Sequence, residues 1–189
     1  MLEQRGADAI IAQGTEAGGH RATFSGVDIA MQPGLFSLLP QVVDAVRVPV
    51  IAAGGVADGR TAAAAFMLGA SAVQLGTAFM RCEEANMFDA HRAALAEADD
   101  SCTLVTDLIS GRPARYMRNR LVDDLVASGL KPLPIPAQLS LTWPLGESGD
   151  RDWAVLLCGQ SVALTKTTAA AELVQRLAEE TTARLRVFG

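Results

Sequence analysis

Three short apolar runs, each closed by glycine, constrain the fold of this chain more than any other feature. They cover residues 7–12, 48–53 and 72–75. Short, nearly continuous apolar runs are typical of strands that are buried on both faces of a parallel sheet. A glycine follows each run within two residues, as expected where a strand ends in a tight turn or approaches a ligand. The sequence therefore predicts three buried strands.

Helical patterns lie between the predicted strands. Residues 38–46 and 60–68 carry apolar side chains at helical spacing, and Asp58 stands where the cap of the second helix is expected. Strands that alternate with helices favour a parallel sheet, either a Rossmann-like sheet or part of a (β/α)8 barrel. A Rossmann sheet needs GxGxxG directly after a strand, and the sequence GGVADG at 54–59 lacks that spacing. The barrel fits better.

Chain length limits how much of a barrel can be present. A complete (β/α)8 barrel takes about 250 residues, whereas this chain has 189 and only three βα units fit before Cys82. We expect residues 1–82 to form the last three βα units of a partial TIM-type (β/α)8 barrel, with about five N-terminal strands missing. Residues 83–189 are expected to be a mostly helical appendage, with an extended, proline-rich surface excursion near 130–144.

Composition excludes several classes of function. The formal net charge is -5 and Lys and Arg form no run, so the chain lacks the basic surface that nucleic-acid binding requires. No apolar stretch approaches the roughly 18 to 20 residues of a membrane span. The three cysteines, Cys82, Cys102 and Cys158, form no CxxC motif, which argues against a disulfide framework and a zinc site. We expect a cytoplasmic protein that binds a small molecule and no metal.

The first candidate site follows the first predicted strand. Residues 13–21 read QGTEAGGHR, and barrel enzymes place their active sites at the carboxyl ends of their strands. His20 in this loop would act as a general base, because imidazole titrates close to neutral pH. For a histidine taken alone, a solvated loop position is the simpler explanation. The neighbouring glycines and a second loop of ligand-binding type favour a functional role.

Two further glycine turns predict a phosphate site. In the segment 53–60 a strand runs into Gly54 and Gly55 and then into a helix, whose N-terminal N–H groups and dipole would attract an anion. Gly55 is better explained by a ligand than by a simple turn. The segment 74–77 follows one βα step later and would complete the phosphate cup.

Other polar residues are weaker candidates. The arginines of the one basic segment could pair with a substrate phosphate, although such clusters are more often solvated faces or ion-pair networks. They are Arg112, Arg115, Arg118 and Arg120. His91 falls in a predicted helix beside Arg92, and we expect it to be exposed.

Four blocks of sequence carry a resemblance to a known family. They are EAGGHR at 16–21, LLPQVVDAV at 38–46, PVIAAGGVADGR at 49–60 and LGASAVQLGTAF at 68–79. In this order and spacing they resemble the nitronate monooxygenases, formerly called 2-nitropropane dioxygenases, which are flavin mononucleotide (FMN) enzymes built on a (β/α)8 barrel. The similarity continues more loosely through 110–121 and 159–177. The same blocks are also similar to flavin-dependent enoyl-acyl-carrier-protein reductases and some quinone reductases.

The resemblance implies roles for individual residues. His20 matches the family's catalytic base, which acts on the carbon next to the nitro group, after which molecular oxygen reacts and a carbonyl compound and nitrite leave. Ala22 stands where the family usually has glycine. The remaining matched positions are implied to bind FMN, either at the flavin or at its phosphate. They are Gln13, Gly18, Gly55, Gln74, Leu75, Gly76 and Thr77.

Three readings follow from these observations. The first is an FMN-dependent nitronate monooxygenase, which we expect to hold flavin weakly or not at all without the early strands. The second is an FMN-dependent enoyl-thioester or quinone reductase that uses NAD(P)H. The third is a non-catalytic half-barrel that associates with a second copy or a partner chain, because half a barrel exposes two sheet edges and an apolar face.

Overall fold

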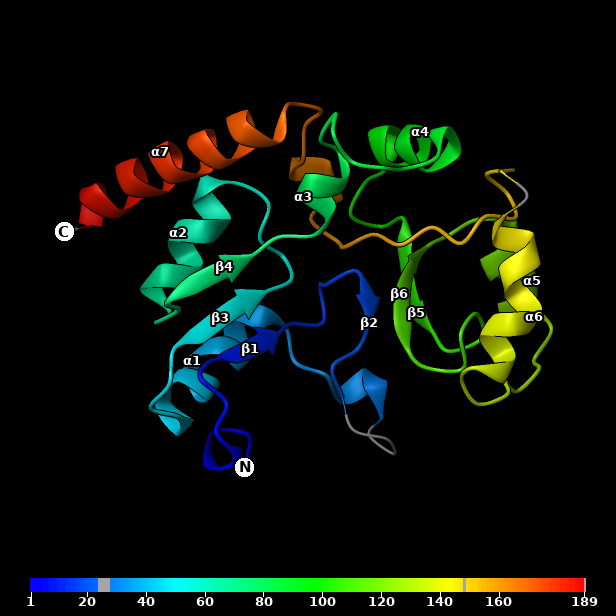
Figure 1. The fold of residues 1–189 in the computed structure, drawn as a ribbon, viewed down its shortest axis with the longest axis horizontal. Helices are drawn as coiled ribbons and strands as arrows, with labels where there is room; N and C mark the ends of the chain where they lie inside the picture. The colour runs from blue at the N-terminus through cyan, green and yellow to red at the C-terminus, as the bar shows by residue number, and fades with distance from the viewer. Residues whose placement is uncertain (24–27, 148, 189) are drawn as a thin grey trace.

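The computed structural model describes residues 1–23, 28–147 and 149–188, and its strands form two sheets that lie beside each other (Figure 1). The first sheet is parallel, with the order β1 (Ile10–Gln13), β3 (Val50–Ala53) and β4 (Ala72–Gln74). Strands that follow one another within this sheet are also neighbours in it, which is the winding of a barrel and not of a Rossmann sheet. The predicted α/β fold with three barrel-type units is confirmed, and the three strands do not close on themselves.

Two helices make the crossovers between these strands. They are α1 (Leu35–Ala45) and α2 (Gly59–Met67). The Asp58 carboxylate accepts the N–H groups of Arg60 and Thr61, so the predicted cap of α2 is confirmed. Leu39, Val50 and Ala52 are fully buried between the sheet and the helices. This layer is the core of the parallel region, by which we mean β1, β3, β4, α1 and α2.

Burial differs between the strands of the parallel region. Every residue of β3 is buried or half-buried, as predicted for a strand covered on both faces. In β1, Ile11 is 53% exposed, so the prediction of burial on both faces is wrong for this strand. β1 lies at an edge of the sheet, and no element of the described chain covers the side chain of Ile11.

The second sheet is antiparallel and was not predicted. Its order is β2 (Gly19–His20), β6 (Ala114–Met117) and β5 (Thr103–Thr106). β2 comes from the loop after β1, whereas β5 and β6 come from the segment in which we expected mostly helix. The sheet therefore joins His20 to Ala114, which lies 94 positions later, and ties the candidate base to the C-terminal half of the chain.

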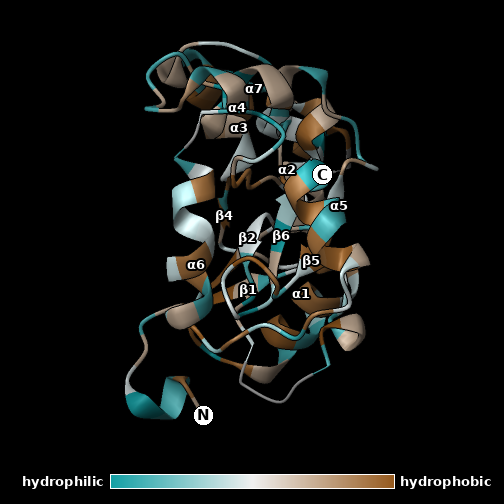
Figure 2. Ribbon diagram, turned by 90° about the vertical axis from the view of Figure 1, so that its right-hand side faces the viewer, coloured by the Kyte–Doolittle hydropathy of each residue, from teal (hydrophilic) through white to brown (hydrophobic). Residues whose placement is uncertain are grey.

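Helices surround the antiparallel sheet and cover part of the parallel one (Figures 1 and 2). They are α3 (Thr77–Met80), α4 (Asp89–Glu97), α5 (Arg120–Ala127), α6 (Ala137–Gly146) and α7 (Ala170–Phe188), with 3-10 turns at Glu3–Arg5, Ile29–Met31 and Val162–Leu164. α7 runs along α2, so the predicted C-terminal amphipathic helix covers the parallel region. Figure 2 shows the N-terminal 3-10 turn as hydrophilic and set apart from both sheets. We call β2, β5, β6 and α4 to α6 the antiparallel region.

Two local expectations are wrong. The segment 137–146 is helical, although we expected an extended excursion up to residue 144. Pro136 stands just before the helix, where a missing N–H removes no helical hydrogen bond, and Pro144 lies in its last turn. His91 is buried, not exposed, because α4 turns His91, Ala94 and Leu95 toward the core at helical spacing.

Candidate functional site

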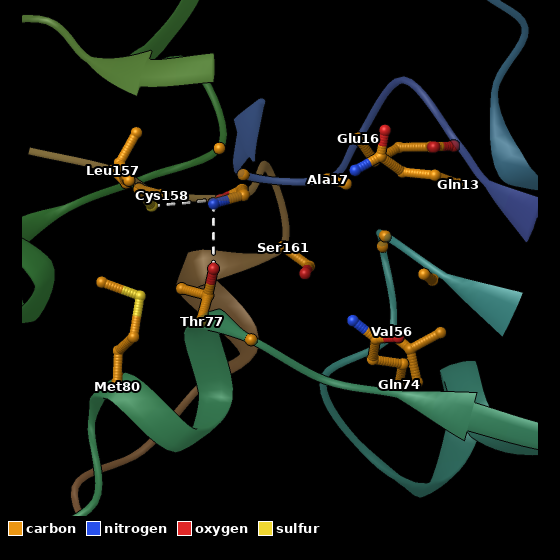
Figure 3. Close-up of a pocket in the computed structure, with 17 residues that line it drawn as sticks. Gln13, Glu16, Ala17, Val56, Gln74, Thr77, Met80, Leu157, Cys158 and Ser161 are labelled. Carbon is orange, nitrogen blue, oxygen red and sulfur yellow. Dashed lines mark hydrogen bonds between the residues drawn. The ribbon is translucent and has the colours of Figure 1, made fainter. Parts of the chain in front are cut away.

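A pocket of about 210 Å³ lies at the carboxyl ends of the three parallel strands (Figure 3). The loops after β1, β3 and β4 form three of its walls, and the segment 157–161 forms the fourth. Six of the predicted cofactor-binding residues line it. They are Gln13, Gly18, Gly55, Gln74, Gly76 and Thr77.

The other two predicted site residues do not line this pocket. Leu75 packs against two apolar clusters, the core of the parallel region and the cluster of Ala78, Cys82 and Leu173. His20 lies on β2, beyond the glycines of the first loop, and its side chain is exposed. The fold therefore brings six candidate cofactor-binding residues together in one pocket, and the candidate base lies on the adjoining strand.

The glycine turns present bare backbone to the pocket. Gly54 and Gly55 have φ values of 93° and 74°, in the left-handed region that favours glycine. At Gly76, an added Cβ would meet no atom within 4 Å. The backbone of these turns can therefore approach a ligand closely, as a phosphate cradle requires.

The N-terminus of α2 does not supply the donors that we expected from it. Asp58 occupies the N–H groups of Arg60 and Thr61, and the N–H of Gly59 donates to Glu180 on α7 at 3.0 Å. The N–H groups of Ala57 and Asp58 donate to the Thr61 hydroxyl. Because these groups already have acceptors, an anion would have to be held by the turns at 54–56 and 76–77.

The fourth wall was missed by the sequence reasoning. An added Cβ on Gly18 would lie 2.6 Å from the backbone carbon of Cys158, so glycine is required there for two chain segments to cross. The Gly159 N–H donates to the Thr77 hydroxyl at 2.9 Å, and this bond joins the wall to the start of α3 (Figure 3). The looser match beginning at residue 159 was the one signal in the sequence that pointed to this segment.

Two buried arginines hold the first loop. Arg21 is 2% exposed, and its guanidinium donates to the carbonyls of Thr15, Ala17, Gly18 and Gly19. Arg115, on β6, donates twice to the Thr15 carbonyl and once to the Thr103 hydroxyl. Burial, together with the charge of Arg115, lowers the pKa of Arg21 to about 10, so the guanidinium stays charged at neutral pH. We call Arg21 and Arg115 the arginine clamp.

Glu16 is the charged residue of the pocket lining. Its carboxylate accepts the Leu35 N–H at 2.8 and 3.0 Å, at the N-terminus of α1. Negative charge is favourable at a helix N-terminus. The charges of Arg21 and Arg115 are also close enough to interact with Glu16. Glu16 therefore anchors the first loop to α1 while its charge is offset by its surroundings.

His20 is held through both its backbone and its side chain. The Gln13 carboxamide donates to the His20 carbonyl at 3.1 Å and accepts the Ala22 N–H at 2.8 Å, so it spans the candidate base. The His20 Nε2 atom lies 2.8 Å from the Ser110 hydroxyl. Partial burial and the charges of Arg112 and Arg21 lower the pKa of His20, which favours the neutral imidazole that a base requires.

The basic segment divides into two parts. Arg118 and Arg120 form exposed ion pairs with Asp123 and Asp124, which confirms the surface interpretation for these two residues. For Arg115 that interpretation is wrong, because the residue is buried in the arginine clamp.

Within the described residues, no group of three or more His, Cys, Asp or Glu side chains could hold a metal ion. The three cysteines are free thiols. Among the helices that the structure describes, none is both long and apolar enough to cross a membrane.

Comparisons with known proteins agree with this geometry. The family model described as nitronate monooxygenase matches residues 1–180. The chain is 41% identical over 185 residues to the nitronate monooxygenase of Pseudomonas aeruginosa, covering 95% of this chain and 53% of the relative. It is 39% identical over 184 residues to a probable nitronate monooxygenase of Staphylococcus haemolyticus, covering 94% and 52%. The chain thus spans about half the length of the curated relatives it matches.

Solved structures give the same picture. A nitroalkane oxidase from Streptomyces ansochromogenes superposes with a TM-score of 0.92 at 38% identity, over 100% of this chain and 55% of that one. FabK from Thermotoga maritima superposes with a TM-score of 0.83 at 31% identity, over 100% and 58%. The family model matches nearly the whole chain, and the structural agreement is close. Both findings lead to the same assignment. The chain belongs to the nitronate monooxygenase family.

Proposed function

We propose that this chain carries the FMN-binding loops and the catalytic base of a nitronate monooxygenase, which converts an alkyl nitronate and molecular oxygen to a carbonyl compound and nitrite. The observation that carries the proposal is the convergence of six matched residues on one pocket, with His20 on the adjoining strand. Three free thiols suit the reducing cytoplasm as its place of action.

The pocket suits one part of FMN. At about 210 Å³ it is smaller than the roughly 300 to 1,000 Å³ of sites that enclose a whole ligand. Its bare turns at Gly54, Gly55 and Gly76 suit a phosphate group, and the described residues of its lining include no lysine or arginine. We therefore expect these loops to hold the phosphate end of FMN, and to hold it weakly. When bound, FMN supplies the electron-accepting chemistry, and the protein supplies position and charge.

His20 and its neighbours would handle the proton and the negative charge. A neutral imidazole can take the proton from the carbon next to a nitro group. Arg112 and Arg21, whose charges act on His20, would also stabilise the nitronate anion that this step produces or that binds directly. Arg21 keeps its own position through the carbonyls of the first loop.

The similarity to FabK favours a second candidate function, a flavin-dependent reductase that takes hydride from NAD(P)H. An experiment in the absence of oxygen distinguishes the two functions. Rapid bleaching of bound FMN by NAD(P)H supports the reductase, whereas bleaching by a nitronate alone supports the monooxygenase.

The test uses the purified full chain with excess FMN. Flavin binding is measured by equilibrium dialysis, and activity by oxygen uptake and nitrite release with an alkyl nitronate or its parent nitroalkane. We expect His20→Gln to lower the rate with the neutral nitroalkane by about 10²- to 10⁴-fold, the usual contribution of a general base. Ser140→Ala, on an exposed position of α6, is the control and should leave the rate unchanged.

Two results would contradict the proposal. A chain that retains no FMN in equilibrium dialysis has no flavin site of its own, and that result would favour the non-catalytic half-barrel. A chain that binds FMN but forms no nitrite would retain the cofactor assignment and lose the reaction.

A further inference from the structure

Ser110 is a buried hydroxyl on which several polar groups converge. It is 1% exposed and lies in the turn that precedes β6. Its Oγ lies 2.8 Å from His20 Nε2, 3.0 Å from the Arg112 carbonyl oxygen, 3.3 Å from the Tyr116 hydroxyl and 3.4 Å from the Arg112 backbone nitrogen. Neither the sequence patterns nor the family resemblance assigned it a role.

The distances in this group favour one direction for each hydrogen bond. A serine hydroxyl has one proton to donate and two lone pairs that accept. The Arg112 carbonyl oxygen lies 3.0 Å from Oγ and can only accept, whereas the Arg112 N–H at 3.4 Å is beyond the usual range for a donor, so the geometry favours a Ser110 proton that points to the carbonyl. In that arrangement the two lone pairs accept from the Tyr116 hydroxyl and from His20 Nε2, so Nε2 carries a hydrogen. The alternative, in which Ser110 donates to Nε2, depends instead on the long contact from the Arg112 N–H.

The same arrangement sets the state of the other imidazole nitrogen. In a neutral histidine only one ring nitrogen carries hydrogen, so Nδ1 is left with a lone pair. In the part of the chain that the structure describes, His20 Nδ1 has no hydrogen-bond partner, and the His20 side chain is exposed. Nδ1 is thus the ring atom that is free to receive a proton.

We propose that Ser110, anchored by Tyr116, is a positioning residue that holds His20 in the Nε2–H tautomer and makes Nδ1 the proton-accepting atom. The inference rests on the proposed function for its role in catalysis. In that step the C–H bond next to the nitro group breaks, the electron pair stays on the nitronate, and the proton moves to Nδ1. The imidazolium then donates through Nε2–H to Ser110 while Nδ1–H faces the product.

The charges around His20 are consistent with this arrangement. Arg21 and Arg112 are the charged groups that act on the ring, and both disfavour the protonated form. The Ser110 hydroxyl can accept from Nε2–H in both protonation states, and more strongly when the ring is charged. It therefore preserves the ring orientation throughout the proton transfer.

Nitrogen-15 NMR of the histidine rings in the full chain measures the tautomer directly. The sequence has two histidines, so each ring is readily assigned. His91 is an internal reference, because its Nε2 lies 2.9 Å from the Leu157 carbonyl, which can only accept. We expect both neutral rings to show a protonated Nε2 and an unprotonated Nδ1. A His20 ring with hydrogen on Nδ1 would overturn the proposal.

Substitutions then test the role of Ser110. In Ser110→Ala we expect the His20 tautomer ratio to fall about fivefold, the factor that one hydrogen bond of ordinary strength supplies. The pKa of His20 should also fall, because the acceptor that favours the charged ring is gone. If Ser110 instead donated to Nε2, its removal would raise that pKa, which would contradict the proposal. Ser110→Thr should restore both values.

Tyr116→Phe is the matched control for disturbance of the core. Tyr116 is 2% exposed and contacts the same hydroxyl, but its loss leaves Ser110 able to accept from Nε2. We expect the His20 tautomer to persist in Tyr116→Phe. A loss as large as in Ser110→Ala would mean that packing sets the ratio, and the role of the Ser110 hydrogen bond would be refuted.

The NMR experiment and the activity assay fail separately. The tautomer is measured without FMN or nitronate, so a chain that releases no nitrite can still confirm the assignment of Nδ1. Conversely, a chain could form nitrite while its His20 ring carries hydrogen on Nδ1. That result would support the proposed function and refute the role of Ser110.

Discussion

The parallel and antiparallel regions of this chain are built in different ways. In the parallel region, each strand pairs with the next one in the sheet through a crossover of ordinary βα type. In the antiparallel region, the two residues of β2 pair with a strand that lies 94 to 96 positions later. The first region is thus specified by local patterns, whereas the second depends on contacts between distant segments. The candidate site takes residues from both.

The largest expected effect comes from breaking the join between the two regions. In Arg115→Met the Thr15 carbonyl and the Thr103 hydroxyl lose the buried, charged donor that reaches them from β6, and we expect the free energy of unfolding to fall by about 4 kcal/mol. Urea unfolding measures the change. Arg60→Met removes an exposed arginine that pairs with Asp58, and this control should cost less than about 1 kcal/mol. Equal losses in the two variants would show that the regions do not depend on the arginine clamp.

A second substitution alters only the pocket surface of the parallel region and leaves the contacts between the two regions intact. Gly76 has a φ of -111°, which any residue can adopt, and open space where a side chain would go. Gly76→Val should therefore keep the stability of the chain but weaken FMN binding by about tenfold or more, because the side chain would occupy the pocket. Fluorescence titration with FMN measures the affinity, with Ser140→Val as the control. Unchanged affinity would place the flavin elsewhere.

The smallest expected effect comes from a substitution within the parallel region. Asp58→Ala removes the cap of α2, and we expect a loss of about 1 kcal/mol in the free energy of unfolding. Hydrogen bonds from Thr61 and Arg60 lower the pKa of Asp58 in the folded chain, against the cost of burial. Its contribution is therefore complete above the unfolded pKa of about 4 and is lost as the pH falls through the lower, folded value.

Asp58→Asn separates the cap from the charge. Asparagine caps helices about as well as aspartate but does not titrate in this range. The variant should keep most of the stability at pH 7 and lose less on acidification to pH 3 than the parent chain does. Thermal unfolding measures the stability of both proteins at each pH. An equal loss of stability in the two proteins would mean that Asp58 does not contribute to the acid sensitivity.

The parallel and antiparallel regions also differ in how well the sequence predicted them. Apolar runs closed by glycine predicted β1, β3 and β4, and Asp58 predicted the start of α2, because these signals depend on near neighbours. The pocket lining followed from placing the three strand ends at one edge. The exposed Ile11 was not foreseen, since an apolar run does not say how many neighbours its strand will have.

The remaining features depend on distant contacts. Nothing near Arg21 or Arg115 indicates that both will bind the carbonyl of Thr15. Ser110 is likewise an ordinary turn residue until β6 brings it to His20. Burial of His91 was the exception, because its spacing from Ala94 and Leu95 could have revealed an apolar face of α4.

The hydrogen bond between Thr77 and Gly159 has a consequence for when the pocket can form during synthesis. The loops of the parallel region emerge from the ribosome first, but the wall at 157–161 follows about 80 residues later. At about 5 to 20 residues per second, that interval lasts several seconds. The pocket proposed for FMN therefore cannot be complete while the first sheet is forming, and it can enclose a ligand only after translation has passed residue 161.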